Sequence, residues 1–156
     1  MVPYDIEPNL ADLTNYRAWA KSERDNLTLF ATLTTSPDHV IAMARFFYPE
    51  FEIYRGGVFR KDDYNPFTVD HWLARTDGDI SATEHMVNLR HLEDVFHDQS
   101  AEWSVETIVF LGHVIQRTWT IALADAFPDR SFKVVAECDE VNPHDVVVSF
   151  WQTHVR

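Results

Sequence analysis

The sequence is poor in cysteine and glycine. Its one cysteine, Cys138, excludes an intramolecular disulfide and is typical of a protein in a reducing compartment. The 156 residues include four glycines, and this scarcity argues against glycine-rich phosphate loops and against all-β folds with many tight turns. The thiol is also a poor nucleophile, because Asp139 and Glu140 follow it and neighbouring carboxylates disfavour a thiolate.

The sequence lacks the pattern of a signal peptide and that of a membrane span. The first ten residues, MVPYDIEPNL, are polar and acidic rather than basic and then apolar. The longest apolar-rich run, residues 108–126, contains His113, Arg117 and Asp125, whereas a membrane-spanning helix needs about 20 nearly uninterrupted apolar residues. We therefore expect a cytoplasmic protein that does not enter a membrane.

Signatures of common catalytic sites are absent as well. The sequence contains no G-x-S-x-G elbow, no P-loop, no glycine triplet of a dinucleotide-binding fold and no HExxH zinc motif. Pairs such as Asp70-His71 do not make a catalytic dyad by adjacency, because neighbouring residues on a helix point about 100° apart. No motif supports catalysis, and we expect no cofactor.

The charge is strongly negative. The chain has 25 acidic and 13 basic residues, for a formal net charge of −12, and no stretch concentrates lysine and arginine. Nucleic-acid binding relies on such clusters, so we exclude nucleic acid as a partner. An acidic surface attracts a basic protein partner, which is the kind of partner we expect. Acidity also keeps cytosolic proteins soluble, so charge alone assigns no function.

What is present is the material of a folded domain. Hydrophobic residues make up 46% of the chain and aromatic residues 13%, enough for a core at this length. The order of helical and strand patterns lacks the strand–helix–strand alternation of parallel sheets. We therefore predict a single α+β domain over residues 1–156. About five helices would pack on a small antiparallel sheet that includes a C-terminal β-hairpin.

Capping residues and prolines mark the predicted helices. Asn9 caps a helix from about residue 10, and Ser36 followed by Pro37 begins another that ends before Pro49. The S-A-T-E sequence at residues 81–84 is a capping-box pattern that predicts a helix over residues 84–96. The remaining predicted elements are helices over residues 67–76 and 104–126, a strand pair around Gly56 and Gly57, and strands over residues 131–137 and 145–151.

Two segments near the N-terminus carry different apolar patterns. Residues 26–35 alternate like a strand but could equally continue the preceding helix, so both alternatives stay open. The helix after Ser36 has apolar residues at helical spacing, which predicts a stripe buried against the core. The members of this stripe are Val40, Ile41, Ala44 and Phe47 or Tyr48.

The segment EHMVNLRHLEDVFHD, residues 84–98, holds three histidines and four carboxylates. On one helix, histidines six residues apart point in different directions, whereas a zinc-binding helix needs ligands one turn apart. We therefore predict no metal site, and we interpret His85 as a core histidine hydrogen-bonded to a neighbour. A metal-dependent hydrolase is the minor alternative. Its ligands would be Glu84, His91, Asp62 and Asp63.

The predicted long helix over residues 104–126 is apolar on nearly all sides, as is typical of a central helix. Polar groups on such a helix can face a cavity, so a small-molecule site or enzyme pocket between this helix and the sheet is a second hypothesis. The simpler interpretation is an arginine–carboxylate pair that holds helix to sheet. The pocket would use His113, Gln116, Arg117, Trp119 and Tyr54.

The run ARFFYPEFEIYRGGVFRKDDYNP, followed by AFPDRSF and a final strand pair, resembles short uncharacterised bacterial proteins. The resemblance covers residues 35–150 and rests on packing and turn features, so it implies no activity and no site residue. The leading functional hypothesis is therefore an acidic interaction or accessory protein of the immunity type. Such a protein binds another protein and has no catalysis of its own.

Overall fold

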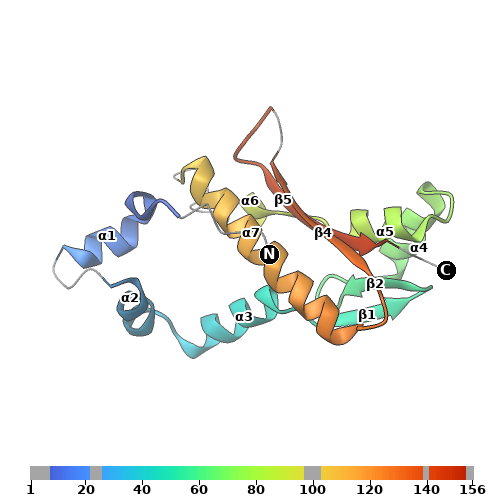
Figure 1. Ribbon diagram of the computed structural model, residues 1–156, viewed down its shortest axis with the longest axis horizontal. Coiled ribbons are helices and arrows are strands. Elements are labelled where there is room, and N and C mark those ends of the chain that lie inside the picture. Colours follow the sequence, from blue (N-terminus) through green and yellow to red (C-terminus); the bar gives the residue numbers. More distant parts are fainter. Residues whose placement is uncertain (1–7, 22–25, 97–102, 139–140, 154–156) are drawn as a thin grey trace.

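The structure is a computed structural model that describes residues 8–21, 26–96, 103–138 and 141–153. Its fold is α+β, as predicted, with two small antiparallel sheets and a long helix, α7 (Val105–Ala126), that crosses the middle of the molecule (Figure 1). Within the described residues, no helix combines the length and apolar character that crossing a bilayer requires.

The larger sheet packs against α7 and forms the main core with it. Its strand order is β3 (Arg90–His91), β5 (Val146–Gln152), β4 (Phe132–Cys138), and all pairs are antiparallel. The β4–β5 pair confirms the predicted C-terminal hairpin. Alternate residues of β5 point at α7, because successive side chains of a strand face opposite sides. The fully buried side chains of this core are Val58, Leu92, Ile108, Ile115, Trp119, Leu123, Val146, Val148 and Phe150.

The smaller sheet is the predicted hairpin around the two glycines. It pairs β1 (Phe51–Tyr54) with β2 (Gly57–Arg60), and Tyr54 lies opposite Gly57. The connecting residues, Arg55 and Gly56, have φ angles of 48° and 84°. Positive φ at both central residues is the geometry of a two-residue turn that matches the twist of the strands. All of β2 is buried, whereas β1 is largely exposed.

The N-terminal part is a chain of short helices: η1 (Leu10–Asp12), α1 (Thr14–Ala20), α2 (Leu27–Thr34) and α3 (Pro37–Phe47). The ambiguous residues 26–35 are therefore helical. Asn26 Oδ1 caps α2 by accepting from Leu29 N at 2.9 Å. Thr32 and Thr34 add hydroxyl bonds to carbonyls four residues earlier. These local bonds explain why the alternating leucines do not form a strand.

The helix predicted over residues 84–96 is wrong in both of its limits. Helix α5 (Ile80–Val87) begins earlier, after α4 (Pro66–Arg75), and its cap is Asp79, whose Oδ1 accepts from Ala82 N at 3.0 Å. Helix α5 then ends at Val87, and the chain turns into strand β3 and the short helix α6 (Leu92–Val95). Pairing of Arg90 and His91 with β5 requires extended backbone, which ends the helix.

Two side chains of α5 join the two sheets. Glu84 and Asn88 lie one turn apart, on the side of α5 that faces the gap between β2 and β5. Glu84 accepts from the backbone N of Val58 and of Gln152, both at 2.7 Å. Asn88 accepts from Arg60 N at 3.1 Å and donates to Val58 O at 3.0 Å and Phe150 O at 3.4 Å. Five backbone groups at two strand edges are satisfied in this way.

The Glu84 carboxyl group is completely buried. Besides the two backbone bonds, it accepts from Gln152 Nε2 at 2.6 Å. Burial raises the pKa of Glu84, because loss of solvent disfavours the charged form more than these hydrogen bonds and the nearby Arg130 charge favour it. Burial of a carboxyl group is energetically unfavourable, so Glu84 has a specific structural role here. It pairs with backbone groups at the edges of β2 and β5 that would otherwise have no hydrogen-bond partner.

We expect Glu84→Ala to lower the free energy of unfolding by at least about 3 kcal/mol. It leaves the donors on Val58 and Gln152 without a partner, and each buried unsatisfied group costs about 1–3 kcal/mol. Glu84→Gln should destabilise the protein less, because the oxygen of its amide still accepts a hydrogen bond. It should still cost some stability, because its NH2 group replaces an acceptor and faces a donor. Urea unfolding followed by circular dichroism measures both. The exposed Glu137→Ala is the control and should change stability by less than about 0.5 kcal/mol; an equal effect at both sites would contradict this role of Glu84.

Candidate functional site

Three of the five predicted pocket residues have structural roles on α7. Trp119 is fully buried, and its indole N–H donates to Phe46 O at 3.0 Å. Gln116 Nε2 donates to Val134 O at 2.8 Å, which ties α7 to β4, and Gln116 Oε1 lies 3.2 Å from His113 Nδ1. These contacts join α7 to α3 and to β4.

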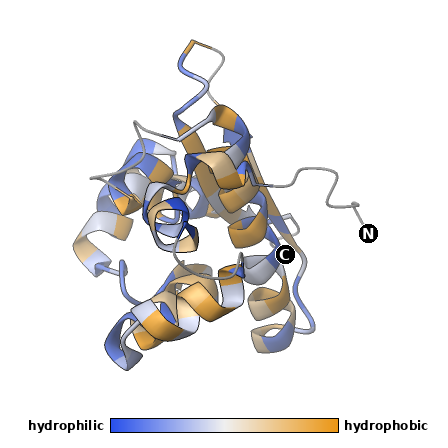
Figure 2. Ribbon diagram, turned by 90° about the vertical axis from the view of Figure 1, so that its left-hand side faces the viewer, coloured by the Kyte–Doolittle hydropathy of each residue, from blue (hydrophilic) through white to orange (hydrophobic). Residues whose placement is uncertain are grey.

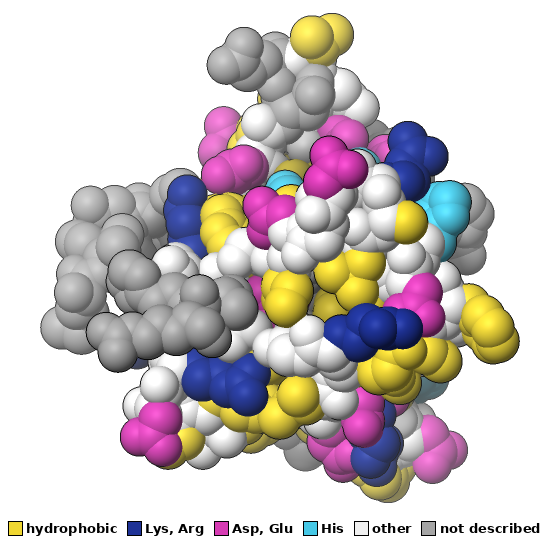
Figure 3. Space-filling view, turned by 90° about the vertical axis from the view of Figure 1, so that its right-hand side faces the viewer, with side chains coloured by type: hydrophobic (Ala, Val, Ile, Leu, Met, Phe, Trp, Pro, Cys, Tyr) yellow, Lys and Arg dark blue, Asp and Glu magenta, His cyan; other side chains and the backbone are white. Residues whose placement is uncertain are grey.

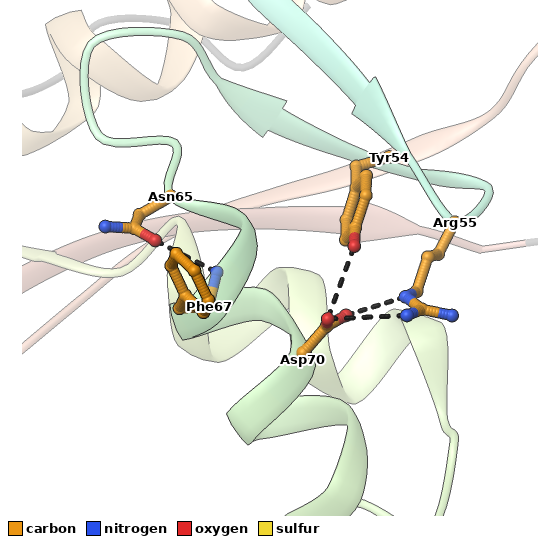
Figure 4. A network of polar contacts seen from close by, with 5 residues as sticks. All are labelled: Tyr54, Arg55, Asn65, Phe67 and Asp70. Atoms are coloured by element: carbon orange, nitrogen blue, oxygen red, sulfur yellow. Dashed lines mark hydrogen bonds and ion pairs between the residues drawn. The ribbon is translucent and has the colours of Figure 1, made fainter.

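The other two, Arg117 and Tyr54, belong to different parts of the molecule. Arg117 is exposed on α7. Tyr54 lies at the end of β1 beside Arg55, and both contact Asp70 of α4 (Figure 4). Arg55 Nε donates to Asp70 Oδ1 at 2.6 Å, and Tyr54 donates to Oδ2 at 3.3 Å. This cluster fastens the hairpin turn to α4.

A hollow of about 350 Å³ lies beside η1 and α1 rather than between α7 and the sheet. It is open to solvent and has no converging set of catalytic side chains, since its polar groups are one phenol and two basic residues. Its lining residues are Leu10, Ala11, Tyr16, Arg17, Ala20 and Lys21.

The four metal ligands of the minor alternative each have a separate environment. Glu84 is held by backbone donors, as described above. Asp63 lies between Arg60 and Arg90 and forms an ion pair with each. His91 Nδ1 lies 2.7 Å from Asp145 Oδ1, and Asp62 is exposed. The structure does not bring these four side chains together around one point.

A different trio, His91, Glu93 and Asp145, has potential ligand atoms within 4.8 Å of one another. His91 belongs to β3, Glu93 to α6, and Asp145 directly precedes β5. The hydrogen bond to Asp145 raises the pKa of His91, and the charge of Asp145 acts in the same direction. An ion pair between β3 and the start of β5 therefore accounts for this arrangement, since a metal would have to displace the bond that already joins two of the three residues.

His85 and Ser149 also lie together, but their geometry does not suit nucleophilic catalysis. Ser149 is fully buried, and its hydroxyl donates to His85 O at 2.7 Å. Its single proton is thus committed, so His85 Nδ1, at 3.1 Å, acts as a donor to Ser149 Oγ rather than as a base. The His85 ring also contacts the Trp151 ring, with 4.7 Å between centroids. His85 is hydrogen-bonded to a neighbour, as the sequence predicted, but it is half-buried rather than part of the core.

Arg60 is a buried arginine that packs against the core residue Trp119. Its guanidinium carbon lies 4.6 Å from the Trp119 ring centroid, with Phe46 on another side. Burial lowers the pKa of Arg60 to about 10, although the charge of Asp63 opposes this change. Arg60 and Asp63 hold the end of β2 beside α7, and Arg90 extends the same group to β3.

Helices α2 and α3 carry the most unusual feature of the described residues, because neither helix contains a buried residue. The predicted buried stripe of α3 is wrong for most of its members, because Val40 is 55% exposed, Ile41 is 61% exposed and Ala44 is exposed. Only Phe47, at the end of the helix, is half-buried and packs against the main core. In α2, Leu33 is 65% exposed. Figure 2 views the molecule from this end and shows hydrophobic segments on the helices there. We define the α2–α3 surface as the exposed apolar residues Leu27, Leu29, Leu33, Val40, Ile41 and Tyr48.

The opposite end of the molecule differs. Figure 3 shows that end with its hydrophobic side chains interspersed among lysine, arginine, aspartate and glutamate side chains. Scattered exposed apolar residues are normal on proteins, whereas several of them on two consecutive helices make the α2–α3 surface a candidate binding site.

Polar bonds and a small aromatic cluster hold helices α1–α3 in place at their two ends. At the start of α7, Asp12 Oδ2 accepts from Ser104 N at 3.0 Å and from the Thr107 hydroxyl at 3.1 Å. At the end of α7, the Tyr48 hydroxyl donates to Asp125. Between these points α2 packs mainly on α1 through aromatic contacts. The rings in contact are Tyr16, Trp19 and Phe30.

Sequence reasoning missed this surface because apolar residues at helical spacing normally face a core. One signal was present: residues 26–37 contain no charged side chain. A helix in contact with water alone usually carries charges on its outer face, so their absence from α2 indicated a contact on more than one side. Comparison with protein-family models, with curated proteins and with solved structures finds no match, so the surface has to be interpreted from its own chemistry.

The His91–Asp145 pair leads to a prediction about pH. The raised pKa of His91 means that the pair stabilises the fold fully below the ordinary histidine pKa, about 6.5, and that this contribution is lost as pH rises through the raised value. We expect Asp145→Asn to lower the pKa of His91, as measured by NMR titration. The difference in unfolding free energy between the wild type and Asp145→Asn should also shrink as pH rises. An unchanged His91 titration in Asp145→Asn would contradict the pairing.

Proposed function

We propose that this protein is an interaction or accessory module without catalysis, and that it binds another protein chain through the α2–α3 surface. The observation that carries the proposal is the exposure of Leu33, Val40 and Ile41. Each of them is more than half exposed to solvent, although it lies on a helix with a capped N-terminus. Leaving such residues in water forgoes about 1.5–3 kcal/mol for each one that a partner would bury.

The arrangement of the polar residues supports the same proposal. The side chains that suggested chemistry, such as Glu84, Ser149 and Gln116, hold helices to strands through hydrogen bonds. Their donors and acceptors are occupied by backbone groups of the protein itself. Several apolar side chains of the α2–α3 surface are exposed on two consecutive helices, and apolar surfaces of this kind mediate protein–protein contact.

An accessory role of the immunity type agrees with this proposal. In such a role a small stable protein covers part of another protein and blocks its action. The net charge of −12 would speed the approach of a basic partner, while apolar contacts at the α2–α3 surface would supply the lasting affinity.

The test immobilises the full chain and captures proteins from a lysate of the cells that express it. Three baits are compared: the wild type, the double variant Leu33→Asp with Ile41→Asp, and Phe67→Asp. Phe67 of α4 is 84% exposed and lies outside the surface, so its variant is a matched control. We expect one protein to be captured in stoichiometric amount by the wild type and by Phe67→Asp, and at least tenfold less by the double variant.

Salt separates the two forces in this experiment. Capture through the α2–α3 surface should persist at about 1 M NaCl, where the Debye length is about 3 Å and charge attraction is screened. Equal capture by all three baits, or capture that depends on salt and not on Leu33 and Ile41, would contradict the proposal.

A further inference from the structure

The α2–α3 surface continues onto α7. Ile121 is 46% exposed and lies one turn before Asp125, so the two share a face of α7. Asp125 bonds to Tyr48, which directly follows α3. Ile121 therefore adjoins the end of α3 and enlarges the apolar area. With Ile121 the surface comprises seven apolar side chains that are 37% to 65% exposed. A standard-size interface buries roughly 800 Å² on each partner.

The same surface is nearly free of charge. Residues 26–47 contain one acidic and one basic residue, Asp38 and Arg45, so this segment has no net charge although the whole chain has −12. Arg45 is also within 3.9 Å of Glu50, which compensates its charge locally. Most acidic residues of the chain lie outside this segment, although Asp125 and Glu50 border the surface through Tyr48 and Arg45.

We propose that the α2–α3 surface binds a second copy of this chain. This rests on the proposed function of the surface as a protein-binding site, and it assigns the surface to self-association rather than to the basic partner that the net charge suggests. Two copies at −12 each repel one another least where charge is scarce, and in residues 26–47 scarcity of charge coincides with exposed apolar side chains. Their contact would be symmetric, so that each residue of the surface meets the same set of residues from the other copy.

The composition of the surface suits such a symmetric contact. Leucine, valine and isoleucine side chains have no donors, acceptors or charges that need a complementary partner, so a surface built from them is complementary to itself. Two of the threonines of α2 do not oppose this, because the Thr32 and Thr34 hydroxyls already donate within the helix. Helices of two copies could therefore pack at the usual 8–10 Å between axes through their aliphatic side chains.

Other occupants fit the surface less well. A basic protein would be recognised by carboxylates, and residues 26–47 offer one, Asp38. A membrane with anionic lipids would be recognised by clustered lysine and arginine, and the same segment has one arginine. The absence of both kinds of charge cluster favours a partner that is itself apolar and uncharged at the contact, and the second copy has that property.

The test measures the mass of the full chain in solution. Sedimentation equilibrium of the wild type is measured over about 1–100 μM, a range that suits dissociation constants in the micromolar range. At the upper concentrations it should show twice the mass of one chain. The double variant Leu33→Asp with Ile41→Asp should raise the dissociation constant at least tenfold. Phe67→Asp should leave it unchanged, and circular dichroism should show that both variants keep the wild-type helix content.

Two results would overturn the second copy as partner. One is a wild type that stays monomeric over the whole range, and the other is a dimer that the double variant does not weaken. Capture from a lysate then separates the two proposals. If the monomeric wild type still captures a different protein through Leu33 and Ile41, the interaction function stands and the self-association fails. If capture also shows no dependence on these residues, both proposals fail.

Discussion

The fold depends on one small set of hydrogen bonds, those that Glu84 and Asn88 of α5 make to strands β2 and β5. The two sheets share no strand pair, and β3 is too short to cover the edge of β5 beyond Val148. Asn88 lies opposite Phe150, where a longer β3 would have continued, and its amide replaces the missing backbone groups. Buried donors and acceptors must be paired. The side chains of Glu84 and Asn88 therefore make the hydrogen bonds to β2 and β5 that the backbone of an additional strand would otherwise make.

This arrangement also explains why the segment 84–98 resembles an active site in its composition. A buried carboxylate and a buried amide one turn apart are expected at a catalytic centre, where perturbed groups gather. Here their partners are backbone N–H and C=O groups, and Gln152 completes the set through both its main chain and its side chain. In this protein the burial of Glu84 is therefore explained by its hydrogen bonds to the edges of β2 and β5.

Much of the fold follows from local sequence rules. The caps at Ser36 and Ser104, the hairpin at Gly56 and the pairing of β4 with β5 were all predictable, since each depends on residues close together in the chain. The end of α5 was not, because Asn88 and Arg90 respond to β2 and β5, which lie far away in sequence. The exposure of Ile41 was hidden for the same reason: helical spacing predicts that a face is buried, but the partner that buries it is a tertiary property.

The contrast between the two halves of the molecule carries the functional argument further. Around α7, long-range contacts and buried side chains specify one structure. Helices α1–α3 have polar anchors at both ends of α7, and α3 also reaches the main core through Phe46 and Phe47. Helix α2 has no buried residue, and short isolated helices are marginal in water. Burial of Leu33 and Ile41 by another chain would add the packing that these helices lack. If a second chain covers this surface as proposed, its binding would also stabilise α2 and α3.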